Sequence, residues 1–108
     1  MPKYLFLFGL KGETFGRFMQ NPTDRSAVVR ELASQVGGEL ESYYFMFGQH
    51  DGAVVCSLPD SASAAAIAVA VAATGTFSHF ETHELISPED MLGILARAKD
   101  ISYRPVGG

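Results

Sequence analysis

Along the chain, the spacing of hydrophobic residues changes repeatedly between the two-residue period of β-strands and the 3.6-residue period of helices. Four runs rich in aromatic and β-branched side chains predict β-strands: residues 3–10, 39–47, 53–58 and 76–86. Three stretches with apolar residues at helical spacing, each begun by capping residues, predict helices: residues 22–36, 60–74 and 87–99. The order strand, helix, strand, strand, helix, strand predicts a ferredoxin-like βαββαβ fold of the α+β class with an added C-terminal helix.

The clearest local signal is a hairpin within residues 39–60. Two predicted strands flank a short polar break with Gly48 and Gly52 at its ends, which is typical of a tight antiparallel connection. In the βαββαβ topology the first and third strands of the four-stranded antiparallel sheet are central, and the second and fourth are its edges. We expect one domain, residues 1–108, with residues 1–98 as its core and 99–108 as a tail.

The predicted strands are apolar on both faces. In the first strand, Tyr4, Phe6 and Phe8 alternate with Leu5 and Leu7. Helices of the same chain can cover only one face of such a sheet, and we expect the other face to expose several aromatic side chains. The sequence therefore predicts that the chain pairs with itself, as a homodimer or a higher homo-oligomer, through the uncovered face.

Residues 11–21 have no clean period and contain two glycines, so we expect a loop there. The segment nevertheless holds Phe15, Phe18 and Met19. These side chains either plug the end of the core, or form a lid over a pocket or a contact with a second subunit. Phe15 and Phe18 are therefore candidates for a ligand pocket.

Composition narrows the classes of function. A formal charge of −4 gives no basic surface for nucleic acid, and the apolar N-terminal run is too short to span a bilayer and lacks a signal-peptide cleavage site. The lone Cys56 lies in a predicted strand, where we expect a small buried hydrophobe in a reducing cytoplasm. The chain also lacks phosphate-loop, Cys/His metal and nucleophile-elbow signatures, which lowers the expectation of an enzyme without excluding one. We expect no cofactor, no nucleic acid partner and no membrane partner.

One polar cluster consists of His79, Glu81 and His83, which alternate on the last predicted strand and so share a face. The Cα atoms of His79 and His83 would lie about 13 Å apart, near the limit for two imidazoles on one metal. One histidine with Glu81 could chelate, but all three fit poorly, and we expect no metal site. The alternatives are a solvated or interface-rim strand with His–Glu hydrogen bonds, and the polar lining of a ligand pocket.

A second cluster is His50-Asp51 in the predicted turn. A histidine beside a carboxylate could act as a proton acceptor, but Asp51 is more simply a turn residue that accepts backbone amide hydrogen bonds. Tyr44, next to Tyr43, is more simply a core or interface aromatic than a catalytic phenol, and it is also a pocket candidate.

Short motifs spread over nearly the whole chain resemble the GYD-domain family: Gly37-Gly38, Gly48-x-His50-Asp51, Pro59-Asp60, Gly75 and Glu81-Thr82. In this comparison His50 replaces the usual Tyr, and Ser57 stands where an acidic residue is expected. The resemblance implies a fold like that of the dimeric α/β-barrel group, in which two sheets pack together with a pocket between or beside them. It implies no substrate.

These observations leave three functions open. The first is a homo-oligomer that binds a small, mostly apolar molecule at the sheet face or the subunit interface. The second is a cofactor-independent enzyme, monooxygenase- or isomerase-like by analogy of fold, with His50, His79 or His83 as its base. The third is a purely structural interaction module, which would have a filled interface and no cavity of ligand size.

Overall fold

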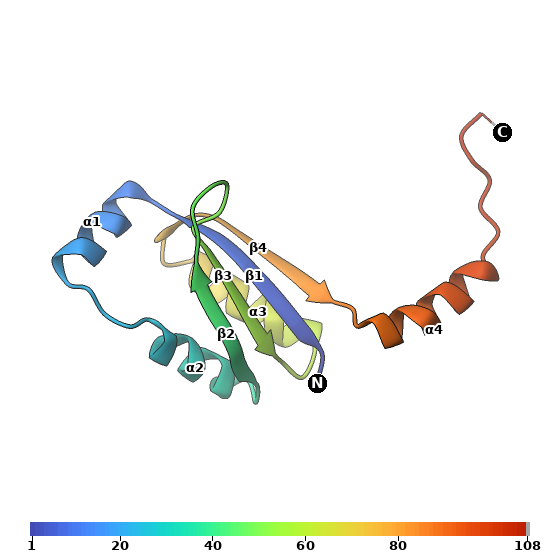
Figure 1. Ribbon diagram of the computed structural model, residues 1–108, viewed down its shortest axis with the longest axis horizontal. Coiled ribbons are helices and arrows are strands. Elements are labelled where there is room, and N and C mark those ends of the chain that lie inside the picture. Colours follow the sequence, from blue (N-terminus) through green and yellow to red (C-terminus); the bar gives the residue numbers. More distant parts are fainter. Residues whose placement is uncertain (108) are drawn as a thin grey trace.

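The computed structural model describes residues 1–107 as a four-stranded antiparallel sheet with four helices (Figure 1). The elements in chain order are β1 (Lys3–Leu10), α1 (Gly12–Gln20), α2 (Ser26–Gln35), β2 (Glu39–Phe45), β3 (Gly52–Ser57), α3 (Ser61–Ala72), β4 (Phe77–Leu85) and α4 (Pro88–Lys99). The strand order β2-β3-β1-β4 puts the first and third strands at the centre. The predicted ferredoxin-like arrangement with an added C-terminal helix is thereby confirmed.

Two helices begin at the capping residues that the sequence indicates. The Asp60 carboxylate accepts a hydrogen bond from the Ser63 N–H at 2.8 Å. Hydrogen bonding by the Ser63 side chain, and secondly by this N–H, lowers the pKa of Asp60. Likewise, the Ser87 hydroxyl accepts from the Asp90 N–H at 3.0 Å at the start of α4. Helix α2 begins four residues later than predicted, because the Asp24 side chain binds the Ser26 N–H at 2.9 Å in a turn outside the helix.

Residues 12–20 form helix α1, so the prediction of a loop here is wrong. Two hydrogen bonds hold this segment at the start of β4. The Thr14 hydroxyl donates to the Thr76 carbonyl oxygen at 2.7 Å, and the Lys11 N–H donates to the same oxygen at 3.3 Å. This long-range anchorage offsets the weak helix propensity of the two glycines, which sequence periodicity alone could not reveal.

Two irregularities in the strand pairing decide which side chains share a face. The register shifts at Glu41 in β2 and at Ser78 in β4, so strict alternation fails at both places. As a result, Tyr43 pairs with buried Val54 instead of pointing to the opposite side. Most strand aromatics therefore gather on the face that helices α2 and α3 cover: Tyr4, Phe6, Phe8, Tyr43, Phe45, Phe77 and Phe80.

The uncovered face is consequently poorer in aromatic side chains than predicted. Among the strand residues of the described chain, Tyr44 is the one aromatic on it, and the prediction of several is wrong. The centre of this face consists of partly exposed aliphatic side chains: Leu5, Leu7, Ala53 and Val55. It remains an unpaired surface of moderate apolarity beside the polar residues of β4.

Phe8 lies at the middle of the core, between the sheet and the helices. Its ring centroid is 5.3 Å from that of Phe77, 6.2 Å from that of Tyr43 and 6.4 Å from that of Phe80. Gly52 of β3 pairs with Phe8 of β1, and a Cβ atom at position 52 would overlap the Phe8 ring. The glycine is therefore required for the Phe8 ring to lie flat across the neighbouring strand.

Helix α4 projects away from the sheet at the end of β4 (Figure 1), and none of its residues is buried. The radius of gyration is accordingly 17.3 Å, whereas about 13 Å is typical of a compact chain of this length. The apolar stripe of α4 includes Met91, Ile94 and Leu95, all of them exposed. None of the helices within residues 1–107 is long and apolar enough to cross a membrane.

Candidate functional site

A cleft of about 780 Å³ lies on the helix-covered side of the sheet. Helix α2 packs over the edge strand β2 and helix α3 over the edge strand β4, which leaves space above the central strands. Buried Phe6, Phe8 and Val54 form its floor. Pockets for small molecules are typically about 300–1,000 Å³ and mostly apolar, so this cleft has the size and lining of such a site.

Helix α1 supplies one wall of the cleft. Phe18 of α1 lies with its ring centroid 5.9 Å from that of Phe45. The opposite walls are aliphatic side chains of α2 and α3, among them Val29, Ile67 and Val71. The walls thus come from three helices, and Phe18, one of the predicted pocket residues, lies in the lining.

Among the residues that the structure describes, the only charged side chains in the lining are Arg17 and Arg25. Within residues 1–107, neither guanidinium has an ion-pair partner. Tyr43 also lines the cleft, and burial raises the pKa of its phenol, so the hydroxyl stays neutral at neutral pH. The lining therefore combines an apolar floor with two unneutralised positive charges, although the whole chain carries −4.

The other predicted pocket residues lie elsewhere. Phe15 is exposed on α1 and outside the cleft lining, and Tyr44 is exposed on the opposite face of the sheet. His79, Glu81 and His83 share a face of β4, as predicted from their spacing, but it is the uncovered face. Within the described part of the chain, no histidine belongs to the cleft lining.

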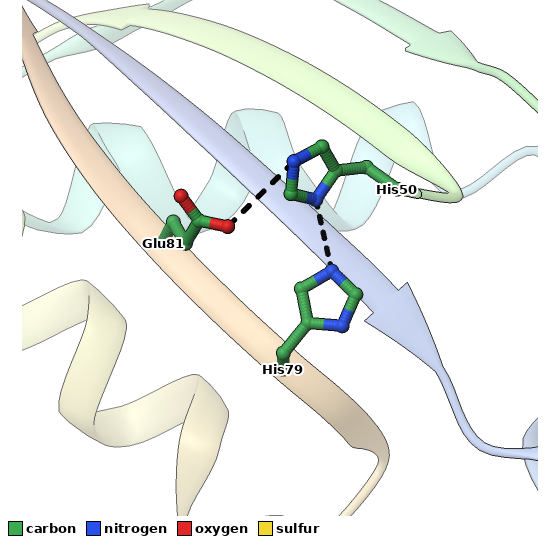
Figure 2. A group of neighbouring side chains, drawn as sticks. All are labelled: His50, His79 and Glu81. Carbon is green, nitrogen blue, oxygen red and sulfur yellow. Dashed lines mark hydrogen bonds and ion pairs between the residues drawn. The ribbon is translucent and has the colours of Figure 1, made fainter. Parts of the chain in front are cut away.

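On the uncovered face, the hairpin turn brings His50 to the polar side chains of β4 (Figure 2). The Nδ1 atom of His50 lies 2.9 Å from Nε2 of His79. The other ring nitrogen of His50, Nε2, lies 3.6 Å from Oε2 of Glu81. Nε2 of His83 lies 3.0 Å from Oε1 of the same carboxylate. All three histidines of the chain therefore meet in one cluster around Glu81.

Asp51 and Gly9 hold this cluster in place. The Asp51 N–H donates to the Phe8 carbonyl oxygen at 2.7 Å, and the Asp51 carboxylate accepts from the Leu10 N–H at 2.8 Å. Asp51 thus fastens the turn to β1 and, as a turn residue, binds backbone amides. Gly9 pairs with His79, and a Cβ atom at position 9 would overlap the His79 ring, so the glycine lets that ring lie across β1.

Sequence reasoning missed the cleft and the meeting of His50 with β4. The cleft arises from the separation of two helices and from two strand bulges, none of which leaves a sequence pattern. The approach of His50 to β4, in contrast, could have been predicted from the strand order. If β1 lies between β3 and β4, the turn that precedes β3 ends beside the start of β4, where His79 lies.

The model of the GYD domain family matches residues 4–95. No curated protein matches the chain. Among solved structures, the crystal structure of MupZ from Pseudomonas fluorescens is similar, with 20% sequence identity and a TM-score of 0.41, over 99% of this chain and 97% of that chain.

Proposed function

The chain belongs to the GYD-domain family, and we propose that it binds a small, mostly apolar molecule in the cleft between its sheet and helices α1, α2 and α3. The observation that carries this proposal is a cleft of about 780 Å³ built by a single chain. Its floor is the aromatic centre of the sheet, and its walls are helix side chains that leave the space open.

The charges at the cleft favour a ligand with an anionic end. Arg17 and Arg25 are the only charged lining residues and have no carboxylate partner among the described residues. A guanidinium binds a carboxylate through paired hydrogen bonds, whereas the Phe6 and Phe8 floor favours a ring or an alkyl chain. An apolar carboxylic acid combines both features.

Binding is better supported than catalysis at this cleft. The enzyme hypothesis took its base from His50, His79 or His83, and these three side chains lie on the other face of the sheet. The lining therefore offers no imidazole to remove a proton from a bound molecule. Retention of an apolar acid requires none.

We further propose that the protein works as a homodimer or a higher homo-oligomer. A helix of 12 residues is marginal in water by itself, and α4 has no buried residue to stabilise it. A second copy would cover the exposed stripe of α4 and the aliphatic centre of the uncovered sheet face. Isologous pairing covers both sets of side chains at once.

We also propose a cytoplasmic location. Cys56 is the single cysteine, and it is a free thiol buried in the core. Burial raises its pKa to about 11, so almost no thiolate forms at neutral pH. The side chain acts as a small hydrophobe and needs no oxidising compartment to fold.

A tryptophan at Val71 tests the proposed cleft. Val71 lines the cleft, whereas Val69, two residues earlier on α3, is 70% exposed and lies outside the lining. We expect Val71→Trp to narrow the cleft and weaken binding of 2-naphthoate, an apolar acid, by about tenfold, or ~1.4 kcal/mol. Isothermal titration calorimetry measures this affinity.

Val69→Trp is the matched control and should bind 2-naphthoate as the unaltered protein does. Since the chain has no natural tryptophan, fluorescence of each variant also reports whether the new side chain is shielded from water. Equal affinities of the two variants, or no saturable binding by the unaltered protein, would contradict the proposal.

A further inference from the structure

We propose that His50, His79 and Glu81 form a binding site for a divalent first-row transition-metal ion on the uncovered face of the sheet. One nitrogen or oxygen atom from each side chain lies within 4.8 Å of the others. Two come from one strand, and the third comes from a turn 29 residues away in sequence from His79 (Figure 2). This site lies opposite the cleft and does not depend on the proposed ligand.

The donor atoms lie close enough together for side-chain movements to bring them onto one ion. Zinc binds histidine nitrogen and carboxylate oxygen at about 2.0–2.2 Å, which puts neighbouring ligand atoms of a tetrahedron about 3.3 Å apart. The 2.9 Å contact with His79 is made by Nδ1 of His50, whereas the 3.6 Å contact with Glu81 is made by Nε2 of the same ring. When each side chain contributes a single donor atom, the three atoms lie within 4.8 Å of one another, so side-chain movements of up to about 1.5 Å would bring them to the spacing of a tetrahedral site.

The chemistry of the three donors selects the type of ion. Two imidazoles and one carboxylate suit zinc and iron(II), whereas calcium and magnesium prefer oxygen ligands alone. Each imidazole binds a metal through a nitrogen without hydrogen, so the hydrogen between His50 and His79 must move to another ring nitrogen or to solvent as the ion enters. The three side chains are partly exposed, which leaves room for water as a further ligand.

His83 is a positioning residue in this proposal. Its Nε2 atom lies 3.0 Å from Oε1 of Glu81, the carboxylate oxygen that does not face His50. A hydrogen bond there would orient the carboxylate and leave Oε2 free for the ion. This explains how His79 and His83, too far apart along β4 to share a metal easily, belong to one site.

The backbone around the cluster is built to bring the donors together. Asp51 fastens the turn that carries His50 to β1 through two backbone hydrogen bonds. Gly9 leaves the space that the His79 ring occupies. As a consequence, the His50 side chain is only 17% exposed, although it lies in a hairpin turn.

Zinc titration of the full chain without a histidine tag tests the site. We expect one Zn²⁺ per chain, measured by competition with a chromogenic chelator. His50→Gln, His79→Gln and Glu81→Gln should each weaken binding by more than the roughly 10–100-fold that loss of a supporting hydrogen bond costs. His83→Gln should fall within that 10–100-fold range.

Two further variants separate ligation from folding. Glu89→Gln, on α4, removes an equivalent carboxylate and should leave zinc affinity unchanged. Gly9→Ala keeps every ligand but displaces the His79 ring, so it should weaken zinc binding while far-ultraviolet circular dichroism stays that of the unaltered protein. Absence of saturable zinc binding, or equal affinity in the His50→Gln and His79→Gln variants and the unaltered protein, would overturn the proposal.

Discussion

Replacement of both Ile94 and Leu95 by glutamate will convert the proposed dimer into monomers. The two side chains are 41% and 53% exposed in the single chain, on a helix with no buried residue. If a second copy covers them, burial of unpaired carboxylates costs several kcal/mol, and symmetry places each substitution in the dimer twice. We expect the dissociation constant to rise by about a thousandfold, or ~4 kcal/mol. Sedimentation velocity over a range of concentrations measures it.

Ala96→Glu is the matched control for this experiment. At 3.6 residues per turn, position 96 lies on the side of α4 opposite to the stripe of Ile94 and Leu95. The control adds one negative charge to the same helix, where the doubly substituted protein has two, and it should leave the dimer intact. An unaltered protein that sediments as a monomer at every concentration, or a doubly substituted protein that still dimerises, would refute the proposed pairing.

The second large effect concerns the aromatic core. Phe8→Ala should lower the free energy of unfolding by about 3–5 kcal/mol, because it removes a buried ring and leaves a cavity. Three aromatic rings lie within 6.4 Å of the Phe8 ring, and the Gly52 backbone lies against its face, so little can move in to fill the space. Urea unfolding followed by circular dichroism measures the change.

Phe47→Ala provides the comparison, because Phe47 is 104% exposed in the turn between β2 and β3. Its removal should change the free energy of unfolding by less than about 0.5 kcal/mol. Similar losses for the two variants would mean that the ring cluster around Phe8 does not organise the core as described.

Local sequence patterns were sufficient for the order and the ends of most elements. The first strand, the caps Asp60 and Ser87, and the glycine that ends α2 follow from residue types and spacing. The topology then followed from the order of strands and helices. Each of these inferences depends on interactions within a few residues, which a single sequence records well.

Features that depend on contacts between distant parts of the chain were harder to predict from the sequence. The bulges at Glu41 and Ser78 shift the strand faces by one residue, and so the aromatics moved from the predicted bare face to the core. Helix α1 depends on its bonds to Thr76. The cluster around Glu81 combines a turn and a strand that sequence reading treated separately, although the predicted strand order already implied their approach.

The most direct test of ligand binding in the cleft is methyl NMR spectroscopy of the full-length protein during titration with 2-naphthoate. We predict saturable shifts for the methyl groups of Val29, Ile67 and Val71, which line the cleft, and none for Leu7 and Val55 on the opposite face. No saturable shift at the cleft residues, either because the cleft closes or because a second copy fills it, would contradict the proposal. So would shifts confined to Leu7 and Val55.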